Sequence, residues 1–149
     1  MTYEELKSKI AENNSKMDEM EAIINEKIDI EMKSKNPDCN AVLRMKDQIS
    51  SLRNRAIHHT DRLKKEYAMQ NSPVDVGDVI ESERRVFKAG GGIKEITHIM
   101  RVERIEVAAF EEPQLTFYGI YLKRDGTPLE RQLTGPIYQN DITRVAKSK

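Results

Sequence analysis

The sequence predicts an α+β protein in which an antiparallel coiled-coil helical hairpin precedes a small five-stranded β domain. Residues 1–72 carry apolar side chains at the three- and four-residue spacing of a helix seam, interrupted only near Asn36-Pro37. The pattern of residues 73–149 instead predicts short strands separated by Gly and Pro turns. We therefore expect two domains, 1–72 and 73–149, with helices over about residues 3–35 and 38–70.

Composition narrows the class of protein without identifying a function. The 149 residues are 34% charged with zero net charge, which suits a long exposed hairpin and argues against a general binder of polyanions. The single cysteine, Cys39, excludes an internal disulfide and fits a reducing compartment. There is no secretory leader pattern and no apolar run near the ~20 residues of a membrane span. We expect a soluble, cytoplasmic protein that does not contact a membrane.

Both predicted helices begin with residues that are typical of a helix N-terminus. Thr2 and Glu5 have the spacing of a capping box. Asn36 is the expected N-cap of the second helix, with Pro37 at its first position and Asp38 favourable near its positive end. Folding about this turn brings the two apolar seams opposite each other: Leu6, Ile10, Asn13, Met17, Met20, Ile24 and Ile28 against Met45, Ile49, Leu52, Ala56, His59, Leu63 and either Glu66 or Tyr67.

The net charges of the two helices and the polar residues within their seams favour this pairing. The first predicted helix has nine acidic and six basic side chains, a net charge of −3, and the second has four and seven, a net charge of +3. Asn13 and His59 should lie opposite each other. We interpret them as a hydrogen-bonded pair that fixes the register, in preference to a pH-sensitive or metal-binding element formed with His58 and Asp61.

A second apolar stripe lies outside the seam, and Ile30 and Leu43 are expected to be neighbours within it. If exposed, it would require cover from a second hairpin in an oligomer, from the β domain or from a foreign partner. Its members are Ile23, Ile30, Leu43 and Ile57.

The β domain is predicted from strand patterns and turn signals. Residues 93–107 form one strand, with a bulge at Glu103-Arg104 where the alternation changes phase, and residues 115–122 form a central strand. Gly90-Gly91-Gly92 is interpreted as a hairpin tip, because no helix follows that would make it a phosphate-binding loop. Other expected features are a loop at 111–113, a turn at Asp125-Gly126, a strand with Leu129 and Leu133 facing inward, a short helical turn at 137–141, a last strand at 142–145 and a tail at 146–149.

These features of residues 74–145, including the Val-Gly-Asp opening, the bent second strand and the turn before the last strand, resemble SH3-like barrels. The resemblance implies a five-stranded barrel of a kind that binds proteins, peptides, RNA or DNA. Aromatic and arginine side chains commonly anchor partners. The candidate binding residues of the barrel are Tyr118, Tyr121, Arg131 and Tyr138. The stretch from Tyr118 to Leu133 also looks like small proteins of phages and mobile elements, which would place the protein in a host cytoplasm.

No catalytic constellation is visible, so we predict neither an enzyme nor a cofactor. There is no nucleophile elbow, P-loop, HExxH or paired CxxC. His58 and His59 point about 100° apart on a helix, so they rarely share a metal, and no metal site is predicted.

Three functions remain open. The leading hypothesis is a non-catalytic protein-binding adaptor or inhibitor that forms a homo-oligomer through its helices. An alternative is a nucleic-acid or RNA-polymerase-binding factor, because a helical hairpin before a β domain resembles the bacterial transcript-cleavage factors. The tip offers Asp38, with Asp29 and Glu31 farther back, and no clear acidic pair. A nucleic-acid patch would use Arg84, Arg85, Lys88, Lys94, Lys123 and Arg124, unless Glu81, Glu83 and Glu95 neutralise it. The third is a protein that sequesters a small molecule such as a nucleotide against host defence.

Overall fold

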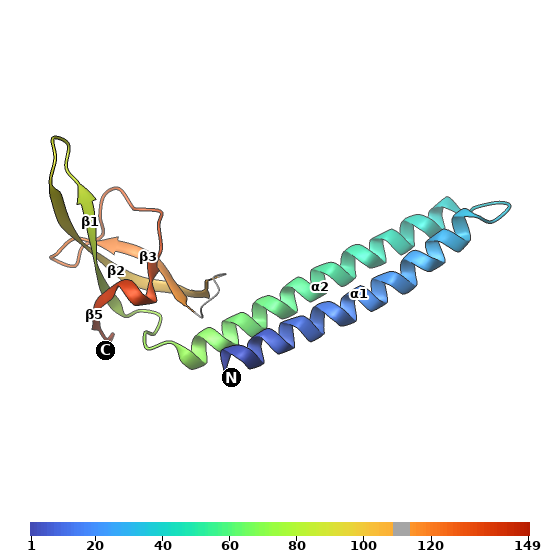
Figure 1. Cartoon of the computed structure of the whole chain (residues 1–149), viewed down its shortest axis with the longest axis horizontal. Coiled ribbons are helices and arrows are strands. Elements are labelled where there is room, and N and C mark those ends of the chain that lie inside the picture. The colour runs from blue at the N-terminus through green and yellow to red at the C-terminus, as the bar shows by residue number, and fades with distance from the viewer. Residues whose placement is uncertain (109–113) are drawn as a thin grey trace. The chain divides into compact units, whose positions relative to one another are not determined.

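The computed structural model describes residues 1–108 and 114–149, and it has two helices followed by a five-stranded antiparallel sheet (Figure 1). The chain is therefore α+β, as predicted. It divides into two compact units, Met1–Lys64 and Lys65–Lys149, which are described separately. The predicted loop at 111–113 lies outside the described residues. Within the described part of the chain, neither helix has the length and apolarity needed to cross a membrane.

Helix α1 spans Tyr3–Met32 and begins with the predicted capping box. The backbone N–H of Glu5 donates to Thr2 Oγ1 at 3.2 Å, and the Thr2 N–H donates to Glu5 Oε2 at 2.7 Å. These two bonds satisfy donors that a helix start otherwise leaves open. The helix ends three residues before the expected position, and its final turn is closed by the Lys33 N–H, which donates to Asp29 O at 3.1 Å.

Helix α2 spans Cys39–Asn71, and its cap differs from the prediction. Asp38 Oδ1 accepts from the N–H groups of Asn40 at 3.0 Å and Ala41 at 3.2 Å, which are the second and third helical positions. A carboxylate placed there satisfies two open donors, so Asp38 is the N-cap. The expectation that Asn36 caps the helix and that Pro37 is its first residue is wrong.

The two helices lie side by side and antiparallel (Figure 1). Most predicted seam positions are buried or half-buried, but Met20 and His59 are exposed. Asn13 Nδ2 instead donates to Ala56 O at 3.1 Å and to Thr60 Oγ1 at 3.3 Å. A straight helix drifts about 20° per heptad against a seven-residue pattern, so the inward position after Ala56 comes four residues later, at Thr60. The predicted Asn13–His59 pair is therefore wrong.

The sheet has the order β4-β3-β2-β1-β5. Its strands are β1 (Val79–Phe87), β2 (Ile93–Val107), β3 (Leu115–Leu122), β4 (Ile137–Tyr138) and β5 (Ile142–Ala146), with the 3₁₀ turn η1 (Gln139–Asp141) before β5. The bulge is confirmed, because the β2–β3 register shifts between Val102 and Arg104. Gly119 faces this bulge, and a Cβ there would lie 1.9 Å from Arg101 O, so only glycine fits.

The predicted strand around Leu129 and Leu133 does not form. The segment is joined to β3 by an isolated bridge between Leu122 and Pro128 and by the Leu129 N–H, which donates to Tyr121 O at 2.9 Å. The Gln132 side chain takes the place of a strand partner, because its Oε1 accepts from Tyr121 N at 2.8 Å and its Nε2 donates to Tyr121 O at 3.3 Å. Leu133 is exposed, which contradicts its predicted inward orientation.

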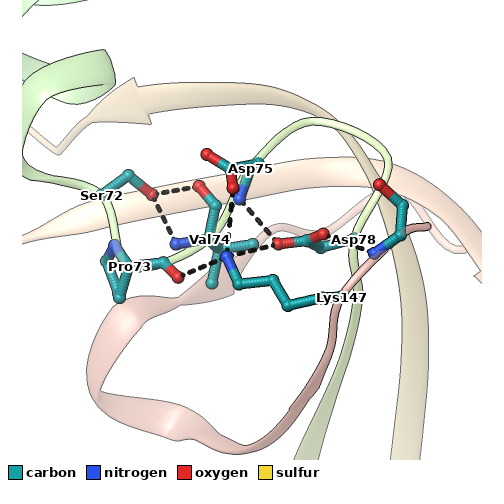
Figure 2. A network of polar contacts seen from close by, with 7 residues as sticks. Ser72, Pro73, Val74, Asp75, Asp78 and Lys147 are labelled. Carbon is teal, nitrogen blue, oxygen red and sulfur yellow. Dashed lines mark hydrogen bonds and ion pairs between the residues drawn. The ribbon is translucent and has the colours of Figure 1, made fainter.

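A polar network fixes the end of the chain to residues 73–78, which precede β1 in the unit Lys65–Lys149, here called the sheet unit (Figure 2). Lys147 Nζ donates to Pro73 O at 3.0 Å and forms ion pairs with Asp75 Oδ2 at 3.1 Å and Asp78 Oδ2 at 2.9 Å. The Ser148 N–H donates to Asp78 Oδ1 at 2.8 Å. Residues 146–149 were predicted as a tail, but Ala146 belongs to β5 and the next two residues are held by this network.

Candidate functional site

The most distinctive surface feature of the sheet unit is a two-stranded arm formed by the outer parts of β1 and β2. The pairing runs without interruption from Val79 opposite Arg101 to Phe87 opposite Ile93. The predicted hairpin tip at Gly90-Gly91-Gly92 is confirmed, with φ between +95° and +99° at its glycines. The side chains of β1 are exposed from residue 83 onward, so the arm extends beyond the buried part of the sheet (Figure 1).

The strand alternation sorts the charges of this arm onto two faces. Ile80 and Met100 are directly paired and fully buried, which identifies their face as the core side of the sheet. Side chains at every second residue share a face. The core side therefore continues along the arm as Ser82 with His98, Arg84 with Ile96, and Val86 with Lys94. Its charged side chains are all basic; we call this surface, with Lys88 next to the tip, the basic arm face.

The opposite face carries the acids. Arg85 and Glu95 are directly opposite each other and form an ion pair at 3.4 Å. Glu81 is paired with Arg144 of β5 at 3.9 Å, and Glu83 follows it on the same face. The acids that were expected to neutralise the patch therefore lie behind the basic arm face. Within residues 1–108 and 114–149, Arg84, Lys88 and Lys94 form no ion pair with a carboxylate.

Arg84 is held in place at the base of the arm. Its Nη2 donates to Pro136 O at 3.2 Å, which ties the arm to the segment before β4. His98 lies on the same face and meets Tyr121 edge-on, with ring centroids 5.8 Å apart and planes at 75°. Burial, together with the positive charge of Arg84, lowers the pKa of His98. A lowered pKa means that His98 is neutral at pH 7, so it donates no charge to this face.

A hollow of about 300 Å³ adjoins the base of the arm. Its wall combines the rings of His98 and Tyr121 with the apolar side chains of Leu129 and Leu133. Lys123 and Arg124 also line the hollow. Lys123 Nζ forms an ion pair with Glu130 Oε1 at 3.8 Å. The predicted patch residues Lys123 and Arg124 are thus placed at the hollow, Arg84 and Lys94 on the basic arm face, Lys88 near the tip, and Arg85 on the opposite face.

The four predicted binding residues of the barrel are not brought together. Tyr121 is 3% exposed and its hydroxyl donates to Gly135 O, so it belongs to the core. Tyr118 is half-buried beneath the guanidinium of Arg104, 4.5 Å from the ring centre. Tyr138 is half-buried in β4, and Arg131 is exposed in the segment before it.

The apolar stripe on the helices is exposed, and it forms two short rows. Ile23, Ile30, Leu43 and Ile57 are each more than half exposed. Ile23 directly precedes the half-buried Ile24, whereas Ile57 directly follows the buried Ala56. Both helices are right-handed but run in opposite directions. The residue before an inward position on one helix and the residue after an inward position on the other therefore lie on opposite flanks of the pair. Ile23 and Ile30 thus occupy one flank, and Leu43 and Ile57 the other, so the expectation of a single stripe in which Ile30 neighbours Leu43 is wrong.

Sequence reasoning missed the most exposed apolar side chain among the described residues of the sheet unit. Phe87, 87% exposed, ends β1 opposite the exposed Ile93. The available signal was an aromatic residue placed three positions before a glycine tip. Alternation alone assigned it to neither the core nor the surface.

The buried carboxylate of Asp78 is the other unusual group, and its contacts explain it structurally. Burial alone would raise its pKa, but N–H groups of Asp75 and Ser148 and the ammonium of Lys147 outweigh this and lower the pKa to about 2. All of these partners belong to the protein itself, so Asp78 is a structural anchor.

Among the described residues, no group of three or more His, Cys, Asp or Glu side chains has the geometry to hold a metal ion. Comparison with protein-family models found no matching family, and comparisons with curated proteins and with solved structures found no match.

Proposed function

We propose that this chain is a non-catalytic protein-binding protein that self-associates through its helical hairpin. The observation that carries the proposal is the pair of exposed apolar rows on Met1–Lys64, formed by Ile23 and Ile30 on one flank and Leu43 and Ile57 on the other. Exposed apolar side chains that line up on one flank of a helix favour contact with another element, whereas apolar side chains scattered singly over a surface need no partner. A second copy of the hairpin is the partner that the charges of the helices favour.

The charges support a dimer in which α1 of one copy packs on α2 of the other. Within its observed bounds α1 has nine acidic and four basic side chains, a net charge of −5, and α2 has three acidic and seven basic, a net charge of +4. A two-fold rotation that places one hairpin against another can set each acidic helix against a basic one. The product would be a four-helix arrangement that encloses one of the two rows from each copy.

Two finer proposals accompany this function. Cross-helix contacts between Asn13 and Thr60 and between Glu21 and Arg53 support coiled-coil pairing of α1 with α2 in one chain. The strand order and the turn η1 before β5 support an SH3-like barrel, a class that commonly binds other proteins. A phage or mobile-element origin, with action as an adaptor or inhibitor in a host cytoplasm, belongs to the same proposal.

Light scattering on the full-length protein tests the self-association. The monomer mass is 17.2 kDa, and the proposal predicts twice this mass at micromolar concentration. The double variants Ile23→Glu/Ile30→Glu and Leu43→Glu/Ile57→Glu each place two charges on one row. At least one should weaken the dimer tenfold or more, because an interfacial isoleucine contributes about 1.5–3 kcal/mol.

The control is Ser8→Glu/Ser15→Glu, an exposed pair on α1 with the same seven-residue spacing as Ile23 and Ile30. It should leave the mass unchanged. A wild-type protein that stays at 17.2 kDa at all concentrations would refute self-association. So would a dimer that neither row variant weakens.

A further inference from the structure

The arm of the sheet unit carries a charge pattern that the composition conceals. On the basic arm face, Arg84 and Lys94 are the charged side chains between the buried Ile80–Met100 pair and the tip, with Lys88 beside the tip. The apolar side chains among them, Val86 and Ile96, are exposed and half-buried. The face therefore combines unpaired positive charge with some apolar surface on an exposed two-stranded ribbon.

We propose that the basic arm face binds the phosphate backbone of duplex DNA. Arg84 and Lys94 lie on neighbouring strands as diagonal neighbours, with Cα atoms on the order of 7–8 Å apart, so their long side chains can reach separate phosphates. Lys88 adds a third cation beyond them. The Pro136 carbonyl oxygen also accepts a hydrogen bond from Arg84. One of the three basic side chains is therefore already oriented before DNA binds.

The shape of the arm favours duplex DNA over other polyanions. The major groove of B-form DNA admits a two-stranded β-ribbon, whereas the major groove of an RNA duplex is too deep and narrow for side chains to read. The acids Glu83 and Glu95 lie on the opposite face, so they point away from DNA that meets the basic arm face. At physiological salt, charges more than about 8–10 Å from the basic arm face are largely screened, so the net charge of the whole chain does not set the local potential of this face.

The binding should be weak and strongly dependent on salt. Three phosphate contacts predict a slope near −2.7 in a plot of log affinity against log salt concentration. Raising the salt from 50 to 200 mM should then weaken binding about 40-fold. The readout is fluorescence anisotropy of a labelled 20-base-pair DNA duplex titrated with the full-length protein, using the RNA duplex of the same sequence and polyglutamate as competitors.

Matched variants on the two faces of the arm separate this proposal from general electrostatics. Lys88→Gln and Lys94→Gln should each reduce the magnitude of the slope by about 1. Arg85→Gln removes the same charge from the opposite face of the same exposed arm and should leave the slope unchanged. Circular dichroism of each variant should match the wild type, since all three side chains are exposed.

Three results would overturn the proposal: no binding of the DNA duplex at 50 mM salt, an equal effect of Arg85→Gln and Lys94→Gln, or equally effective competition by RNA duplex or polyglutamate. None of these bears on the helical rows, so the self-association proposal stands or fails independently.

Discussion

Replacing Asp78 by asparagine keeps the size of a buried side chain and removes its charge. In the wild type the carboxylate accepts from the N–H groups of Asp75 at 2.9 Å and Ser148 at 2.8 Å, and it pairs with Lys147 at 2.9 Å (Figure 2). An asparagine amide has one acceptor oxygen and one donor nitrogen. One of the two backbone donors would then face an NH₂ group, and Lys147 would lose its buried counter-charge.

The pKa of Asp78 sets the scale of the effect. The folded-state pKa is about 2 against an ordinary value of 3.8, and one pKa unit corresponds to 1.36 kcal/mol. The interactions that favour the charged form thus stabilise the fold by about 2 kcal/mol at neutral pH. Because the pKa is lowered, this stability is present above pH 3.8 and is lost as the pH falls through 2. The variant Asp78→Asn should lose a similar amount at pH 7 and show a weaker acid dependence.

Urea unfolding followed by circular dichroism measures the stability, and amide hydrogen exchange measures the local effect. The amides of Asp75 and Ser148 should exchange faster in Asp78→Asn than in the wild type. The control is Asp75→Asn, which changes an exposed partner of Lys147 and should cost less than about 1 kcal/mol. Unchanged exchange at Ser148, together with an unchanged urea midpoint at pH 7, would show that the network does not stabilise the end of the chain.

The remaining predictions concern the sheet. Gly119→Ala should destabilise the protein by about 3 kcal/mol or more in urea unfolding, because the new Cβ would meet Arg101 O at 1.9 Å and force the bulge apart. A soluble variant with a wild-type midpoint would contradict this. Ser82→Ala should raise the stability by about 1 kcal/mol, since the buried Ser82 Oγ has no hydrogen-bond partner among the described residues; a loss instead would point to a bound water. Arg84→Gln should raise the pKa of His98 in an NMR titration, and it should reduce the stability lost when the pH falls below the ordinary histidine range. An unmoved His98 pKa would exclude Arg84 as a cause.

Elements fixed by local alternation were predicted closely. The bounds 93–107 and 115–122 match β2 and β3, because each run of strand-forming residues is ended by turn residues. The bulge was also predictable, since a change of phase within one strand requires an extra residue. These features depend on side chains near each other in sequence, where patterns are informative.

The errors arose where a side chain competes with the backbone or where small geometric differences accumulate. Gln132 Oε1 accepts from the Tyr121 N–H, so the pairing that begins with the Leu129 N–H on Tyr121 O does not continue as a strand toward Leu133. The contact of Asn13 with Thr60 follows from helix drift over several turns. The anchoring of Lys147 joins residues more than 70 positions apart. No local pattern encodes any of these three choices.

The candidate site illustrates why charge counts alone are weak evidence. Summed over residues 83–95, four basic and two acidic side chains look like a nearly neutralised patch. The pairing of Arg85 with Glu95 across the hairpin separates them into a paired face and an unpaired basic face. This separation depends on register, because a slip of one residue would move every side chain of one strand to the other face. The glycine tip, which closes the hairpin between Lys88 and Gly92, therefore determines the electrostatics of the arm as well as its shape.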